Sequence, residues 1–241
     1  MKPVYKKIFW VILFSIAMGF MESAVVIYLR EIYYSDGFHF PLKPIESSIA
    51  RVEFFRELAS IIMLIAVGYL SGKTKLQRFA YFNLAFAVWD IFYYVFLYIF
   101  LGWPESVKTW DILLLVPVPW VGPVWAPCLI ALLMIIGSIF IIKEVEKNIL
   151  YKIKLIYWAL LISGALICIL SFMWDYLQYS HETTAWSFLS NKNLFCEISN
   201  YIPTSFYLSL FLIGFITMLT PVCYLIIEPL IKLKLKINSN K

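Results

Sequence analysis

Residues 79–101 read FAYFNLAFAVWDIFYYVFLYIFL, a run of apolar and aromatic residues in which Asp90 is the one charged side chain. A helix rises about 1.5 Å per residue, so a run of this length can cross the roughly 30 Å hydrocarbon core of a bilayer. The shorter alternating pattern of a membrane β-barrel does not fit it. The stretch therefore predicts a transmembrane helix.

Five further runs of this kind lie on either side of it. The chain of 241 residues is 62% hydrophobic with a mean hydropathy of +0.83, whereas soluble domains are about half apolar. The sequence predicts an all-α polytopic membrane bundle forming one domain, residues 1–241. The first run is expected to be retained, because no signal-peptide cleavage pattern ends it. The predicted spans are residues 8–29, 52–71, 79–101, 124–142, 155–174 and 203–227.

The basic residues predict how the bundle is oriented. The N-terminus, residues 72–78, residues 143–154 and the C-terminal tail carry 3, 3, 4 and 4 Lys or Arg, 14 of the chain's 20. The positive-inside rule therefore places both termini in the cytoplasm. The net charge of +5 then reflects topology and attraction to lipid headgroups. No basic and aromatic pattern points to nucleic acid as a partner.

Two acidic residues lie well inside predicted spans, Glu22 and Asp90. Ionisable groups at such depths are costly and usually face a bundle interior, so each is a functional candidate. Asp90 must be protonated, paired with an arginine or bound to a cation. Tyr94 lies four residues further along the same helix face and could donate a hydrogen bond to Asp90.

Other charged residues are predicted near the outer ends of the spans. Glu53 and Glu57 share a helical face beside Arg56, although the two acids could merely offset a helix dipole. Asp175 falls at the C-terminal end of a span, where the dipole disfavours a carboxylate, so it needs a partner. The predicted outward-facing polar cluster comprises Glu22, Glu53, Arg56, Glu57, Asp90, Tyr94, Asp111 and Asp175.

The segment before the fourth span reads TWDILLLVPVPWVGPVWAP, residues 109–127. Its prolines at 117, 119 and 123 disfavour a continuous helix. We expect a short helix capped by Asp111, followed by a Pro- and Trp-rich element that lies at the interface or re-enters the membrane within residues 109–123. This element could cover the carboxylate cluster as a roof, or it could be a rigid apolar lid without chemistry.

Four stretches together resemble a family of bacterial multi-pass membrane proteins that has no assigned activity. The resemblance covers roughly residues 18–127 and implies a helical protein of the bacterial inner membrane. It implies no activity and no site residues. The stretches are GFMESAVVIYLREIYY (19–34), EFFRELA (53–59), VWDIFYYVFL (88–97) and LGWPESVKTWDILLLVPVPWVGPVWAP (101–127).

Several chemistries have no motif in the chain. The two histidines, His39 and His181, fall in predicted loops, and no haem, zinc (HExxH) or nucleotide (P-loop) motif is present. Carboxylate, arginine and tyrosine chemistry remains, and the carboxylates could hold a hard cation such as Mg²⁺ or Ca²⁺.

Three functions stay open on the sequence. The first is a binding or transport protein for an ion or small polar solute. The second is an intramembrane enzyme acting on a lipid or isoprenoid, with Asp90 or Glu22 as acid or base. The third is an accessory subunit of a membrane complex, in which the charges pair structurally.

Overall fold

The computed structural model describes residues 3–34, 37–41, 43, 46–114, 119–147, 153–183 and 201–238. Six helices in this part of the chain are long and apolar enough to cross a membrane, which confirms the predicted all-α polytopic bundle. In chain order the elements are α1 (Pro3–Tyr33), α2 (Ser47–Ser71), α3 (Lys75–Leu101), β1 (Trp110–Leu114), β2 (Trp120–Pro123), α4 (Trp125–Glu146), α5 (Leu155–Thr183) and α7 (Leu208–Asn238).

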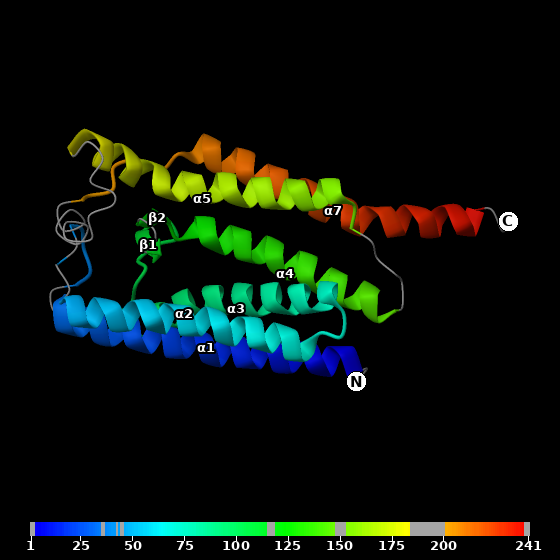
Figure 1. The fold of residues 1–241 in the computed structure, drawn as a ribbon, viewed down its shortest axis with the longest axis horizontal. Helices are drawn as coiled ribbons and strands as arrows, with labels where there is room; N and C mark the ends of the chain where they lie inside the picture. The colour runs from blue at the N-terminus through cyan, green and yellow to red at the C-terminus, as the bar shows by residue number, and fades with distance from the viewer. Residues whose placement is uncertain are drawn as a thin grey trace.

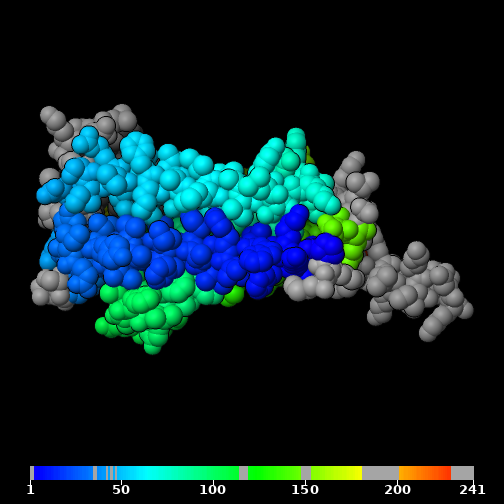
Figure 2. Space-filling view, turned by 90° about the horizontal axis from the view of Figure 1, so that it is seen from below, coloured from blue at the N-terminus to red at the C-terminus, as the bar shows by residue number. Residues whose placement is uncertain are grey.

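The helices run along the long axis of the molecule, and the two ends of the bundle differ (Figure 1). Both chain termini lie at one end, here called the terminal end. The strands β1 and β2 lie at the other, here called the strand end. Viewed from below, α1 and α2 lie side by side along one face (Figure 2).

Helix α3 organises the first group of helices, because α1, α2 and α4 all pack against it. Two glycines allow the close approach. A Cβ atom added at Gly19 of α1 would lie 3.0 Å from the Trp89 carbonyl oxygen, and one added at Gly68 of α2 would lie 2.8 Å from the Phe82 amide nitrogen. Small residues hold membrane helices together in this way, because lipid provides no hydrophobic drive for association.

Helices α5 and α7 form a second closely packed pair. A Cβ atom added at Gly164 of α5 would lie 2.7 Å from the Gly214 carbonyl oxygen of α7. Cys168, Phe172 and Phe211 of this pair are buried in a common apolar cluster with Ala126 of α4. The two groups of helices therefore share an apolar contact through α4.

The segment before α4 is a β-hairpin, so the predicted short helix capped by Asp111 is wrong. Strands β1 and β2 pair antiparallel, with Asp111 opposite Gly122. Strand pairing satisfies the hydrogen-bonding groups of the backbone, which a membrane protein cannot leave without partners. It also accommodates Pro123 at the end of β2, whereas the interior of a continuous helix would not. The prediction that the helix is interrupted before the fourth span is confirmed, whereas Pro117 lies outside the described residues.

The hairpin also connects the two groups of helices. Strand β2 packs against α5, where a Cβ atom on Gly122 would meet the Phe172 ring at 2.8 Å. Val121 is buried with Tyr176 and Tyr201. Strand β1 turns Asp111 toward Arg30 of α1.

We predict that Gly164→Ala lowers the free energy of unfolding by about 1–3 kcal/mol, because the added methyl group would press on the α7 backbone. Gly137→Ala is the matched control: its Cβ atom would meet the Val222 side chain at ordinary contact distances, 3.6 and 3.7 Å. Equilibrium unfolding in mixed micelles measures both variants. Equal stabilities would contradict the packing described for α5 and α7.

Candidate functional site

Arg56 of α2 is the centre of a first polar cluster near the strand end. Its guanidinium group forms ion pairs with Glu22 of α1 and with Glu53, one turn earlier on α2. The Arg56 Nε atom also donates to Glu53 at 2.9 Å, and the Ser60 hydroxyl donates to Glu22 at 3.3 Å. The three charged side chains are 11–20% exposed. One guanidinium group thus joins two helices that otherwise contact each other little.

A third carboxylate, Glu57, lies within electrostatic range of this cluster. It is half-buried, and within the described residues it makes no hydrogen bond or ion pair of its own. Glu22, Glu53 and Glu57 therefore share one guanidinium group. The ionised cluster carries an excess of negative charge that a bound cation would compensate.

A second polar cluster surrounds Arg30 near the C-terminal end of α1. The Arg30 guanidinium group lies 3.8 Å from the Trp103 ring centroid and 4.3 Å from that of Phe38. The distance between its Nη2 atom and Asp111 Oδ1 is 3.8 Å. Cation–π contacts of this kind stabilise a guanidinium group that is withdrawn from water. Arg30 is accordingly buried although it is charged.

Asp111 is only partly satisfied by Arg30. It is 3% exposed, and its Oδ2 atom has no hydrogen-bond partner in the described part of the chain. Burial raises the pKa of Asp111 to about 6, although Arg30, the Ile112 amide and the nearby Tyr94 hydroxyl act in the opposite direction. A buried carboxylate oxygen without a donor is unusual and costly. Such an oxygen is suited to take a proton or a hydrogen-bond donor.

Asp90 of α3 interacts electrostatically with Asp111 and with Cys128 of α4. The expected hydrogen bond from Tyr94 to Asp90 is not found among the described residues. The Tyr94 ring instead packs against Tyr93 and Trp103, with centroid distances of 4.9 and 6.4 Å. Asp90 has no ion pair within the described ranges either. Asp90 and Asp111 therefore interact with each other, and Asp111 makes the ion pair with Arg30.

Asp175 does not join either cluster through its hydrogen bonds, so its predicted place among the other acids is not supported by its contacts. Its carboxylate accepts a bond from the Tyr201 hydroxyl at 2.7 Å. It also accepts bonds from the amide and hydroxyl groups of Thr204 and Ser205, at 2.9 to 3.1 Å. The expectation that Asp175 needs a partner is confirmed. Because it holds residues 201–205 beside α5, α7 begins only at Leu208 and not at the predicted Pro203.

Sequence reasoning did not assign Ser60, Phe38 or Trp103 to the site. Ser60 could have been found, because it lies four residues after Arg56 and so on the same helical face. Phe38 and Trp103 lie outside the helices, where no periodicity places a side chain. Only the tertiary structure shows that they enclose Arg30.

No group of three or more His, Cys, Asp and Glu side chains arranged to hold a metal ion is present in the described part of the chain. Five carboxylates are instead distributed over the two clusters: Glu22, Glu53 and Glu57 in the first, and Asp90 and Asp111 in the second. Comparison of the chain with family models, with curated proteins and with solved structures found no match.

We predict that Arg56→Gln lowers the free energy of unfolding by about 2–3 kcal/mol, because it leaves Glu22 and Glu53 partly buried without a cation. Equilibrium unfolding in mixed micelles measures the effect. The double variant Glu22→Gln, Arg56→Gln should recover part of the loss. Lys108→Gln, which removes an exposed positive charge from the loop after α3, is the control. The ion pairs would carry no such energy if Arg56→Gln matched this control.

We predict that the pH dependence of stability changes in Asp111→Asn. The pKa of Asp111 is about 6 in the folded state, and the ordinary pKa of an aspartate side chain is 3.8. Its contribution to stability is therefore full below pH 3.8 and is lost as the pH rises to about 6. Relative to Asp111→Asn, the wild type should lose about 3 kcal/mol over this range. Unfolding curves from pH 4 to 7 test this, and parallel curves would contradict it.

Proposed function

We propose that the protein binds and transports a small cation, or a small polar solute together with a proton. The site is formed by the two polar clusters around Arg56 and Arg30 near the strand end, called the acidic clusters from here on. The residues proposed to carry the site are Glu22, Glu53, Arg56, Glu57, Asp90, Tyr94 and Asp111. Arg30 is proposed to hold Asp111. Asp175 is proposed as a structural carboxylate, because its hydrogen bonds already satisfy it.

The proposal rests chiefly on one observation, the excess of acidic over basic side chains in the two clusters. Four carboxylates, those of Glu22, Glu53, Glu57 and Asp111, interact there with the guanidinium groups of Arg30 and Arg56. A fifth, that of Asp90, interacts with Asp111. Asp90 lies in the middle of a membrane-spanning helix, and Asp111 has a buried oxygen without a donor. Charges that served only to hold helices together would be expected to pair fully, as Asp175 does. Acidic side chains that are not fully paired with basic ones are suited to a site that binds a cation.

The orientation of the bundle is part of the proposal. Both termini lie at one end, and most Lys and Arg residues of the chain are predicted at that end. We infer that the terminal end faces the cytoplasm of a bacterium, that the protein lies in the inner membrane, and that the strand end faces outward. A cation arriving from outside would then reach the acidic clusters first.

The arrangement also suggests how binding could be linked to movement. Arg56 pairs with acids on both α1 and α2, and Glu57 lies nearby without a bond of its own. A cation that takes one of these carboxylates would release the guanidinium group to pair with another. Because the two helices contact each other little, such an exchange would change their separation while each stays packed on α3.

Thermal stability and vesicle uptake test the proposal. The purified protein is heated in lithium, sodium, potassium, ammonium or choline chloride at constant ionic strength. Proton uptake into proteoliposomes is followed with an internal pH dye under a potassium diffusion potential. We expect either a stabilising cation or proton uptake above protein-free vesicles. We expect Asp90→Asn to reduce that response about tenfold or more, since it removes a charge from the site.

Glu105→Gln is the matched control, because Glu105 is an exposed acid in the loop between α3 and β1. It should respond as the wild type does. The proposal fails if no cation stabilises the protein and no proton uptake is seen. It fails equally if Asp90→Asn and Glu105→Gln respond alike.

A further inference from the structure

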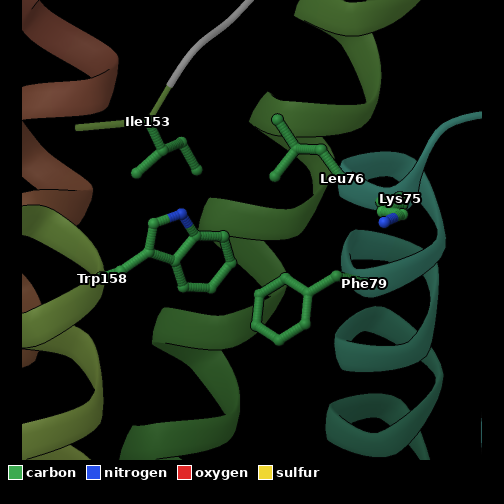
Figure 3. Close-up of a pocket in the computed structure, with 5 residues that line it drawn as sticks. All are labelled: Lys75, Leu76, Phe79, Ile153 and Trp158. Atoms are coloured by element: carbon green, nitrogen blue, oxygen red, sulfur yellow. The ribbon is translucent and has the colours of Figure 1, made fainter. Parts of the chain in front are cut away.

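An open cleft of about 320 Å³ lies at the terminal end of the bundle, remote from the acidic clusters. Figure 3 shows its lining residues, which come from α3, from α5 and from the residues just before α5, with α4 passing behind them. They are Lys75, Leu76, Phe79, Ile153 and Trp158.

The walls of the cleft are apolar and aromatic. Phe79 and Trp158 project toward each other from α3 and α5 (Figure 3), and their ring centroids are 5.0 Å apart in an edge-to-face arrangement. Leu155 and Ile156, at the start of α5, are 84% and 58% exposed. In a membrane-spanning chain, such apolar exposure identifies a surface that faces lipid. The cleft therefore has apolar walls and lies beside a lipid-facing surface.

The rim of the cleft is positively charged. Lys75 is the first residue of α3, is exposed, and forms no ion pair or hydrogen bond through its side chain within the described residues. Lys154, which directly precedes α5, does not line the cleft, and its ammonium group lies over the Tyr224 ring of α7. Neither helix has an acidic residue in its first turn, so the positive ends of their dipoles are not neutralised there. The rim complements a negative headgroup.

We propose that this cleft binds an anionic phospholipid. The phosphate lies at Lys75, and an acyl chain lies along the apolar surface formed by the contacting Phe79 and Trp158 rings. Tryptophan and lysine side chains at a membrane boundary are suited to the headgroup level, and a basic pocket between helices selects lipids of negative charge. The lipid would cover the contact between Phe79 of α3 and Trp158 of α5 and so support the junction of the two helix groups. This proposal is independent of the function proposed for the strand end.

A second apolar groove at the terminal end also has lysines among its lining residues. It lies between α1 and α2, has a volume of about 460 Å³ and includes Lys6, Lys7 and Trp10. There the Lys7 ammonium group already donates to the Ser71 carbonyl oxygen at 2.8 Å. Lys75 has no such bond, so its charge is available to a ligand.

Quenching of Trp158 fluorescence by brominated phospholipids tests the proposal. The protein is reconstituted with brominated phosphatidylglycerol or brominated phosphatidylcholine. The signal of Trp158 is obtained by subtracting that of Trp158→Phe. We expect half-quenching at about fivefold lower mole fraction of the anionic lipid, as one lysine contact would give. Lys75→Gln should abolish this preference.

Lys73→Gln is the matched control, because Lys73 is an exposed lysine two residues earlier that does not line the cleft. It should keep the preference for the anionic lipid. Equal quenching of the wild type by both lipids would show ordinary contact with the surrounding bilayer and would overturn the proposal. So would an equal loss in Lys73→Gln and Lys75→Gln, which would show a diffuse charge effect. Thermal melts of each variant verify that the fold is intact.

Discussion

The close approach of α1 and α2 to α3 is the constraint on which the rest of the structure depends. Helices that are apolar on all sides gain nothing in lipid from burying one face more than another. Gly19 and Gly68 fix their positions by allowing backbone contact with Trp89 and Phe82. With both helices seated on α3, Glu22 and Arg56 come opposite each other. The geometry of the first acidic cluster therefore depends on glycine, which has no side chain, at positions 19 and 68.

The role of each buried carboxylate then depends on which hydrogen-bond donors the fold places next to it. Asp175 receives hydroxyl and amide donors from residues 201–205 and becomes a structural joint of the second helix group. Asp111 has a more distant guanidinium group, the Ile112 amide and the Tyr94 hydroxyl nearby, and its Oδ2 atom has no donor within the described residues. The two aspartates differ little in burial, so their different roles arise from hydrogen bonding. A carboxylate that is satisfied holds the fold, and one that is not can take a ligand.

The two ends of the bundle have opposite chemical character. Acidic side chains in excess gather near the strand end, where the hairpin brings Asp111 toward α1. The terminal end has lysines above apolar grooves. This separation is the basis for placing a cation site at one end and an anionic lipid at the other. It also means that the two proposals can succeed or fail separately.

The sequence by itself determined the membrane class, the six spans and the acids that a bilayer penalises, because apolar run length and charge are local properties. The break before the fourth span was also visible, since prolines exclude a continuous helix. Tertiary structure alone decided that the break is a hairpin, because strand pairing depends on a partner segment. It alone separated Asp175 from the other acids and enclosed Arg30 between Phe38 and Trp103. Those contacts join residues distant in the chain or placed in loops, where no periodicity carries information about which side chains meet.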